Sequence, residues 1–177
     1  MQSWGPGNGI YLGRGLVLTA AHVVGRTFWT RPKVIVADHE LATQTIREGS
    51  LEGTDLTLLR IDEKSLPISL ALRLNPICKT DPAPGQEVAA VIRSKIVYSR
   101  VLSPAILPPN ARRFQTIIGD VATTASSGAG VFDLRRKCLL GIVSRKISGR
   151  VGNQMRDLAT YFVPAAEIRV FIPPQFQ

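Results

Sequence analysis

The chain alternates short apolar runs with turn signals along almost its whole length. The runs are rich in Val, Ile, Leu and Thr, and this pattern is typical of β-strands rather than helices. In the first half the runs predict strands near residues 9–13, 16–20, 33–37, 43–49 and 55–61. In the second half they predict strands near residues 87–93, 96–103, 113–118, 130–134, 138–145 and 158–163. The fold class that follows is all-β.

Two stretches depart from the strand pattern. The sequence "VPAAEIRVFI" at 163–172 has helical periodicity, and Pro164 suits the first position of a helix. A single helical turn is also expected to start at Ala20 and to carry His22. We therefore expect one short helix close to the C-terminal end of the sequence.

A segment without periodicity separates the two groups of strands. Residues 73–86, "RLNPICKTDPAPGQ", contain three prolines and one glycine, which is typical of a connector. We expect an N-terminal barrel at 1–75, a connector at 76–86 and a C-terminal barrel with the terminal helix at 87–177. Together they would form two packed six-stranded antiparallel barrels.

The predicted strand counts are uneven. Five strands before the connector leave the first barrel with an open edge, and exposed edges are usually covered. Either another segment fills the gap, or an N-terminal strand is missing from the chain. The second alternative predicts a module of a longer protein, or a homo-oligomer that completes the barrel between chains.

Composition and charge fit a globular protein with a basic second half. The chain has 177 residues, of which 45% are hydrophobic and 20% charged, and its net charge is +9. Residues 87–177 carry 13 Lys or Arg against 5 Asp or Glu, clustered at 112–113, 135–137 and 144–146. We expect this surface to attract acidic partners, with a functionally silent basic surface as the alternative. No aromatic residues are interleaved with the clusters to stack nucleic-acid bases.

Nothing in the sequence predicts a membrane span or a leader. The longest apolar run, at 15–25, is too short to cross a bilayer and contains a histidine. The first residues, "MQSWGPGNG", have neither the basic start nor the apolar stretch of a signal peptide. Cytoplasm, periplasm and exterior all remain open on this reasoning.

The two cysteines, Cys78 and Cys138, lie 60 residues apart and match no metal or redox spacing. We expect two free, partly buried thiols, with one long-range disulfide as the alternative. Because no His, Cys or carboxylate cluster has ligand spacing, we expect no metal and no cofactor.

Few residues are candidates for chemistry. His22 follows a predicted strand in "VLTAAHVVG", whereas His39 in "ADHEL" is expected to be an exposed turn residue. Asp55 opens the apolar strand "TDLTLLRI", and Ser127 lies in the small-residue loop "ATTASSGAG". Each has an ordinary structural interpretation: a half-buried histidine, a strand-entry aspartate and a turn serine. A buried Asp55 beside an imidazole would instead fix the tautomer of that ring.

The blocks "LTAAHVV", "TDLTLLRI" and "SSGAGVFD" follow one another in the order His, Asp, Ser. In this order they resemble the chymotrypsin-like (trypsin-fold) serine proteases, especially the compact bacterial HtrA-type and glutamyl-endopeptidase-type members. The blocks "GNGIYLGRGLVLTAAHVV", "LLGIVSRK" and "TYFVPAAEI" extend the resemblance over residues 8–172. It implies a serine endopeptidase with Ser127 as nucleophile, His22 as general base and Asp55 as the orienting acid. The substrate would be a protein or peptide.

The resemblance also implies a substrate cleft. The backbone N–H groups of Ala125 and Ser127 would form the oxyanion hole, which binds the negative oxygen of the reaction intermediate. Further substrate-binding positions would be Val121, Ser144, Arg145, Lys146 and Thr160. Val121 would form the floor of the primary pocket and Thr160 would narrow its opposite wall. We expect a pocket for a small or medium apolar side chain.

The strand after Ser144 adds a second expectation about specificity. Arg145 and Lys146 would lie on the strand that pairs with the substrate backbone. They would favour acidic residues upstream of the cut, with side chains pointing into solvent as the alternative.

The chain departs from the family pattern beside the nucleophile. Ala125 stands where the family usually has glycine, and Ala costs roughly 1–2 kcal/mol in left-handed backbone conformations. Ser126 stands where trypsins carry the acid that pairs with a newly cleaved N-terminus, so no such activation is expected. Two other functions therefore stay open. One is a catalytically weak protease fold used as a binding module, and the other is a nucleic-acid-binding all-β domain.

Overall fold

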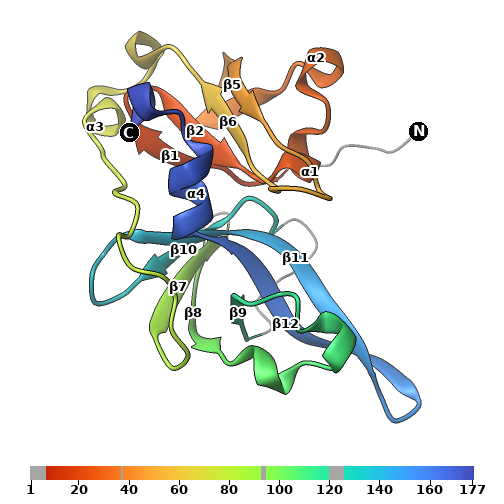
Figure 1. Cartoon of the computed structure of the whole chain (residues 1–177). Helices are drawn as coiled ribbons and strands as arrows, with labels where there is room; N and C mark the ends of the chain where they lie inside the picture. Colours follow the sequence, from red (N-terminus) through yellow and green to blue (C-terminus); the bar gives the residue numbers. More distant parts are fainter. Residues whose placement is uncertain (1–6, 37, 93–94, 120–125) are drawn as a thin grey trace.

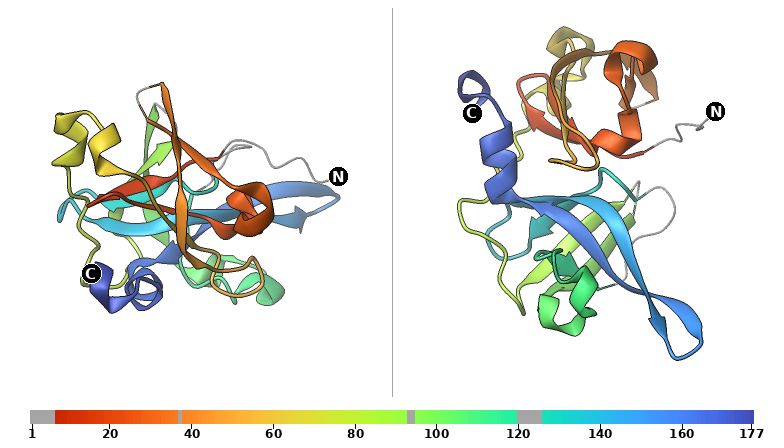
Figure 2. Two further views of the ribbon diagram at one scale, coloured as in Figure 1. Left: turned by 90° about the horizontal axis from the view of Figure 1, so that it is seen from above. Right: turned by 45° about the vertical axis from the view of Figure 1, so that its right-hand side comes forward.

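The computed structural model describes residues 7–36, 38–92, 95–119 and 126–177. The two groups of strands form two bodies that lie one above the other, with helix α4 (Ala165–Phe171) running alongside both (Figure 1). The long hairpin of β11 (Leu139–Val151) and β12 (Gln154–Pro164) extends beyond the lower body (Figure 2). All helices of the described ranges are short, and none could span a bilayer.

The first half contains a four-stranded antiparallel sheet and a separate hairpin. The sheet has the order β1 (Ile10–Gly13), β2 (Leu16–Thr19), β6 (Thr57–Arg60) and β5 (Gln44–Glu48). The hairpin pairs β3 (Lys33–Val36) with β4 (His39–Ala42). Short helices α1 (Ala21–Val24), α2 (Thr27–Thr30) and α3 (Ile68–Ala71) and the 3₁₀ turn Glu63–Ser65 complete this half.

The prediction of five strands in this half is wrong, because β4 is a sixth. His39 is exposed as expected, but it begins this strand instead of lying in the turn. Just before β4, Asp38 lies in the left-handed region at φ 63°. In the described residues the ladders join the six strands into sheets of four and two, and not into one closed barrel.

The second half is the closed six-stranded barrel that the sequence predicts. The strand order is β10 (Gly130–Asp133), β11, β12, β9 (Ile117–Ile118), β8 (Lys95–Leu102) and β7 (Glu87–Ile92). Pairing of β10 with β7 closes the ring. The strand predicted at 113–118 is reduced to two residues, preceded by 3₁₀ turns at Pro104–Ile106 and Pro109–Ala111. The expected terminal helix is α4, followed by a 3₁₀ turn at Pro174–Phe176.

Two large apolar cores organise the molecule, and one of them joins the halves. One core fills the barrel and includes Val88, Val131 and Phe162. The other lies between the halves and is built from both of them and from α4. Its fully buried members include Leu18 and Leu58 of the first half, Ile142 and Val163 of the second half, and Ile168 of the helix. The first half therefore buries much of its apolar surface against the second.

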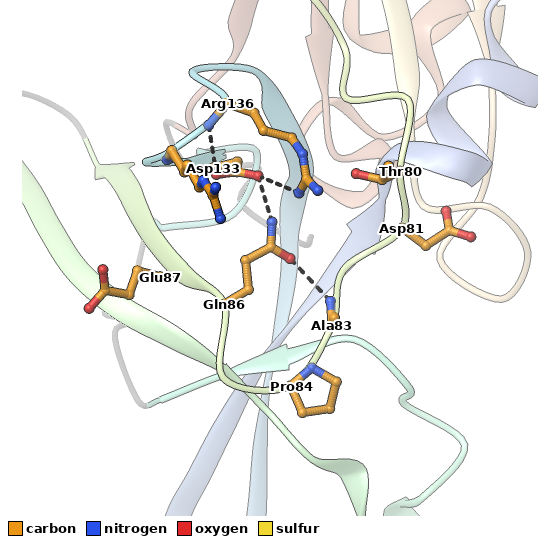
Figure 3. A pocket seen from close by; sticks show the side chains of 9 residues that line it. Thr80, Asp81, Ala83, Pro84, Gln86, Glu87, Asp133 and Arg136 are labelled. Carbon is orange, nitrogen blue, oxygen red and sulfur yellow. Dashed lines mark hydrogen bonds and ion pairs between the residues drawn. The ribbon is translucent and has the colours of Figure 1, made fainter.

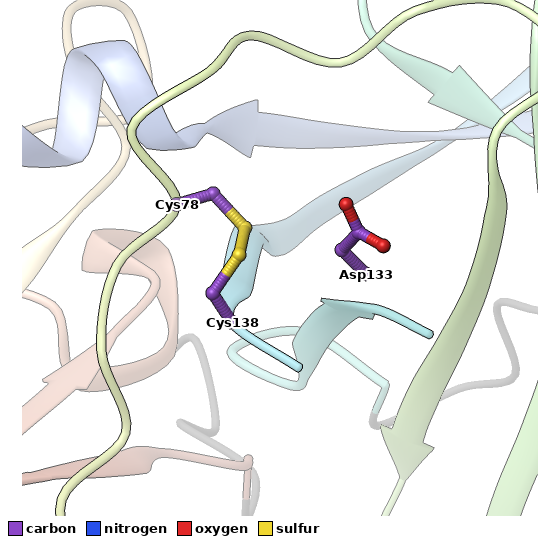
Figure 4. Close-up of side chains that lie close together, drawn as sticks. All are labelled: Cys78, Asp133 and Cys138. Carbon is purple, nitrogen blue, oxygen red and sulfur yellow. A yellow bond between two sulfur atoms is a disulfide. The ribbon is translucent and has the colours of Figure 1, made fainter. Parts of the chain in front are cut away.

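A disulfide joins Cys78 to Cys138, with their Cα atoms 5.1 Å apart (Figure 4). The expectation of two free thiols is wrong. The connector runs beside the start of β11, because the Cys78 N–H donates to the Leu139 carbonyl (2.9 Å) and the Leu139 N–H donates to the Pro76 carbonyl (2.8 Å). This backbone pairing brings together two cysteines that are distant in the sequence.

Candidate active site

His22 is positioned by the one-turn helix α1, directly after β2. The preceding Ala20 and Ala21 are buried, so the chain turns here with only small side chains inside. Gly25, at φ 64°, ends the turn. The His22 side chain remains 28% exposed, which leaves its ring in reach of both the interior and a ligand.

Asp55 lies just before β6 and is 2% exposed. Its Oδ2 lies 2.8 Å from Nδ1 of His22, and its Oδ1 accepts the His22 backbone N–H at 3.1 Å. Burial by itself would raise the pKa of Asp55. The hydrogen bonds from His22 and Ser144 and the nearby imidazole outweigh burial, so the pKa lies below its ordinary value. Asp55 is therefore a carboxylate that holds His22 at two points.

Ser127 occupies the turn that leads into β10. The next residue, Gly128, has φ 82°, and a Cβ there would overlap the carbonyl of Asn8. Only glycine fits, because it alone adopts this conformation without steric cost. The Asn8 N–H donates to the Ser127 carbonyl at 2.9 Å, and the Gly128 N–H donates to the Val143 carbonyl at 2.8 Å. These bonds fix the turn between the two halves.

Ser144 connects the two sides of the site. Val143 and Arg145 pair with the adjacent residues Phe162 and Tyr161, so Ser144 is the extra residue of a β-bulge. Its buried hydroxyl donates to Asp55 Oδ2 at 2.6 Å. Its carbonyl accepts the hydroxyl of Ser127 at 3.2 Å. The sequence placed Ser144 in the substrate cleft but missed its bond to Asp55; a bulge leaves no clear sequence signal.

The structure thus brings His22, Asp55, Ser127 and Ser144 together where the two halves meet. In the described residues no hydrogen bond joins Ser127 directly to the His22 ring. The connection runs instead from His22 to Asp55, to the Ser144 hydroxyl, and from the Ser144 carbonyl to Ser127.

The other predicted site residues have mixed positions. Arg145 donates to the Leu51 carbonyl at 2.7 Å, and Lys146 forms an ion pair with Asp157 at 2.8 Å. Thr160 is fully buried opposite Lys146 in the β11–β12 ladder. Val121 and Ala125 lie outside the described residues. These two residues are the expected floor of the primary pocket and one of the two expected donors of the oxyanion hole.

A pocket elsewhere on the molecule involves none of these residues. It lies between the connector and the β10–β11 turn and is lined by residues that include Thr80, Gln86 and Arg136 (Figure 3). At its edge Asp133 is buried and accepts hydrogen bonds from Gln86, from the guanidinium of Arg136 and from two backbone N–H groups.

In the described part of the chain, one group has a metal-like cluster of ligand atoms, namely Cys78, Asp133 and Cys138 (Figure 4). The disulfide occupies both sulfur atoms, and each Asp133 oxygen already accepts two hydrogen bonds. The donor set therefore does not suit a metal ion, which needs thiolates and free lone pairs.

The fold is that of the chymotrypsin-like proteins. The sequence profile of the trypsin-like peptidase domain matches residues 7–142, a segment that contains His22, Asp55 and Ser127. The chain belongs to the trypsin-like peptidase family. No curated protein matches it by sequence.

Solved structures share the fold at low sequence identity. The Rv3671c protein of M. tuberculosis, in an inactive form, superposes with a TM-score of 0.62 at 15% identity, over 93% of this chain and 78% of that one. Kallikrein-related peptidase 10 in complex with Zn²⁺ gives 0.67 at 17%, over 96% and 88%. The HtrA-type protease AlgW with a decapeptide gives 0.59 at 19%, over 92% and 50%. These likenesses support the fold.

Proposed function

We propose that this chain is a serine endopeptidase that cleaves peptide bonds with Ser127, His22 and Asp55. The observation that carries the proposal is the buried carboxylate of Asp55, which receives both the His22 ring and the His22 backbone N–H. An unpaired buried carboxylate would cost several kcal/mol, so this arrangement is stable only with its partners in place. It holds the imidazole in the tautomer that leaves Nε2 free to accept a proton.

The proposed reaction is acyl transfer in two steps. Ser127 Oγ attacks the peptide carbonyl while His22 takes the hydroxyl proton, and His22 then gives that proton to the leaving amine. The acyl group remains on Ser127 until water, deprotonated by His22, attacks the ester; the Ser127–acyl bond then breaks, the acid leaves and His22 returns the proton to Ser127 Oγ. Asp55 keeps its negative charge throughout and stabilises the imidazolium.

The oxyanion would be bound by the backbone N–H groups of Ser127 and Ala125. Loss of one such donor typically costs about 2.7–4 kcal/mol in kcat. Within the described residues, the N–H of Gly128 is already bonded to the Val143 carbonyl and is not a further donor. The proposal therefore depends on the conformation of Ala125.

The remaining sequence expectations belong to the same proposal. The primary pocket, with Val121 as its floor and with Ser144 and Thr160 nearby, would take a small or medium apolar side chain. Residues 1–75 and 87–177, joined by 76–86, would act as one protease domain. The six strands of the first half would correspond to the N-terminal barrel that the sequence predicts. We also propose that the basic second half attracts acidic partners. The chain would act as a module of a longer protein or as a homo-oligomer.

A second candidate function is a catalytically weak protease fold that binds peptides. One observation favours it: the Ser127 hydroxyl donates to the Ser144 carbonyl and, among the described residues, not to His22. A change of rotamer about the Ser127 Cα–Cβ bond would redirect this hydroxyl. The two functions therefore differ by whether substrate brings Ser127 to His22.

Peptide-library cleavage by the purified protein tests the proposal. The wild-type chain should cleave with turnover, and Ser127→Ala should lower kcat on the order of 10⁴- to 10⁶-fold. Ser148→Ala is the matched control, because its hydroxyl is bonded to the exposed Asp157. Saturable peptide binding without any cleavage by a folded wild-type protein would replace the proposal by the binding module.

A further inference from the structure

Arg145 does not point into solvent from its strand. It follows Ser144 in the bulge of β11, and its side chain reaches across to the first half. One guanidinium nitrogen, Nη2, donates to the Leu51 carbonyl at 2.7 Å, and Nε donates to the Ser144 hydroxyl oxygen at 3.4 Å. The guanidinium also lies over the ring of Phe114, 5.6 Å from its centroid. One side chain thus contacts three segments around the candidate site.

The contact with Ser144 adds a second hydrogen bond to that hydroxyl. A serine hydroxyl has one proton to donate and lone pairs to accept with. Asp55 is a carboxylate without a proton to give, so the Ser144 hydroxyl donates to its Oδ2, 2.6 Å away. An arginine has no acceptor, so Arg145 donates to the same hydroxyl oxygen. Arg145 therefore holds in place the hydroxyl that binds Asp55 from the second half.

The contact with Leu51 holds the turn that leads into Asp55. This turn, residues 49–54, is closed by bonds from the Gly49 N–H to the Leu56 carbonyl (2.9 Å) and from the Ser50 N–H to the Thr54 carbonyl (3.1 Å). The Leu51 side chain is 41% exposed, so packing does little to fix the tip of the turn. The bond from Arg145 ties that tip to the second half, four residues before Asp55.

Among the described residues, the charge of Arg145 is not neutralised by an ion pair. In the described ranges no carboxylate forms a salt bridge with it, and its hydrogen-bond acceptors are neutral oxygens. Tyr161 lies close by and packs on Phe114 with 5.0 Å between the ring centroids. Burial, with Glu167 nearby, raises the pKa of Tyr161 to about 12, although the Arg145 charge acts the other way. Tyr161 is thus a neutral phenol, and the described hydrogen bonds of Arg145 lead through the Ser144 hydroxyl to the carboxylate of Asp55.

We propose that Arg145 is a positioning residue that aligns Asp55 and Ser144 across the junction of the two halves. This inference rests on the proposed function, because it assigns the residue to the same site. The expectation that Arg145 favours acidic residues in the substrate stays a separate prediction, because the guanidinium has five N–H donors and these two bonds use only part of them.

The variant Arg145→Met separates positioning from packing. Methionine keeps an unbranched apolar stem over Phe114 but has no donor. For a short peptide substrate we expect kcat to fall about 10- to 100-fold with KM within about threefold, as for loss of a hydrogen bond to a charged group. Arg145→Lys should recover only part of kcat, because one ammonium cannot keep both bonds of the planar fork. A role in packing alone would leave kcat of Arg145→Met unchanged, and a role in substrate binding would raise KM.

Arg113→Met is the matched control. Its guanidinium lies 5.0 Å from the centroid of the same Phe114 ring, and Arg113 is exposed. This control removes an equal charge from the same aromatic neighbour, and we expect kcat within about twofold of wild type. An equal loss in both variants would overturn the proposal.

A double-mutant cycle tests the route through Ser144. If Arg145 acts on Asp55 by way of the Ser144 hydroxyl, Arg145→Met should cost less in a Ser144→Ala background than in the wild type. Fully additive losses would contradict this route.

A spectroscopic test does not depend on activity. The chain has two histidines, so the low-field ¹H NMR signal of the His22 Nδ1 proton that bonds to Asp55 can be assigned with a His39→Gln variant. Arg145→Met should shift or broaden this signal, and Arg113→Met should not. An unchanged signal in Arg145→Met would overturn the proposal even for an inactive protein. Absence of peptide cleavage in the wild type would count against the proposed function alone.

Discussion

The two halves of the molecule complete their strands in different ways. In the second half six strands close into one barrel around its own core, and a disulfide ties the connector to the barrel. In the described part of the first half the strands form a sheet of four and a hairpin, which pack on a small core of their own around Val17 and Leu59. A larger core is shared with the other half. The barrel is thus closed by its own strands, whereas the first half is an open arrangement that also relies on the junction.

The candidate site is divided along the same line. His22 and Asp55 come from the first half, and Ser127, Ser144 and Arg145 come from the second. Their geometry is therefore only as rigid as the junction. Besides the shared core, the junction contains the bonds of Asn8 with Ser127 and of Arg145 with Leu51. Perturbing each half should consequently have different effects on activity and on stability.

The largest expected effect comes from the carboxylate that both halves hold. Asp55→Asn should lower kcat about 10⁴-fold, because an amide donates where the carboxylate accepts and favours the wrong imidazole tautomer. Circular dichroism should show the fold retained. Asp62→Asn is the control, because Asp62 is an exposed cap of a 3₁₀ turn and asparagine also caps. Full activity of Asp55→Asn would separate Asp55 from the chemistry.

The core shared by the two halves should contribute strongly to the free energy of unfolding. Ile168→Ala removes a fully buried side chain of α4 from this core and should lower the free energy of unfolding by about 2–5 kcal/mol. Val170→Ala on the same helix, where the side chain is 79% exposed, should change it by less than about 0.5 kcal/mol.

Urea denaturation measures these changes in the free energy of unfolding. Hydrogen exchange shows which half of the molecule loses protection first. We expect the amides of β1, β2 and β6 to lose protection in Ile168→Ala before those of the barrel strands β7 and β10. Equal loss of protection in both halves would show that they unfold as one unit and would remove the distinction drawn between them.

The disulfide should stabilise the second half without affecting the chemistry. Replacing Cys78 and Cys138 together by serine opens a loop of 60 residues and should cost about 2–4 kcal/mol of unfolding free energy. The kcat at low temperature should stay within about twofold, because neither cysteine contacts the candidate triad residues. Denaturation midpoints and peptide assays on the same samples give both numbers. A large loss of kcat with little loss of stability would contradict this division.

The smallest expected effect concerns stability in acid, to which two buried carboxylates contribute. For both Asp55 and Asp133, burial is outweighed by hydrogen bonds, so each pKa lies below its usual value of about 3.8. The pKa of each carboxyl group is therefore lower in the folded protein than in the unfolded chain. Their stabilisation is therefore complete above about pH 4 and is lost as the pH falls through the folded value.

Unfolding free energies measured between pH 7 and pH 2 should show this loss, with a shallower slope for Asp133→Asn than for wild type. Asp157→Asn serves as the comparison, because Asp157 is exposed and solvent screens its charge. Identical slopes for wild type and Asp133→Asn would exclude Asp133 as a source of the acid sensitivity.

The sequence predicts what depends on local patterns and on the order of motifs. Alternating apolar positions predict nearly all strands, and the small residues before His22 predict its helical turn. The strand at 39–42 was missed because His39 and Glu40 are polar and exposed, so no alternation marks it. The Cys78–Cys138 bridge stays only an alternative on the sequence, because it depends on the path of the connector beside β11.

The site was predictable at the level of residues and not at the level of contacts. The order of the His, Asp and Ser blocks brings three residues to one place once the fold is known. The β-bulge at Ser144 turns its hydroxyl to Asp55, and the Arg145 side chain folds back across the junction. Both features arise from register and packing between distant segments, which the linear pattern does not contain.

The most direct test of the central claim is labelling of the wild-type protein with a fluorophosphonate probe, read by mass spectrometry. The probe reacts with a serine hydroxyl only when a neighbouring base activates it. We predict labelling of Ser127 that disappears in both Ser127→Ala and His22→Ala. A folded wild-type protein that is not labelled, or labelling of Ser127 that persists in His22→Ala, would contradict an assembled triad.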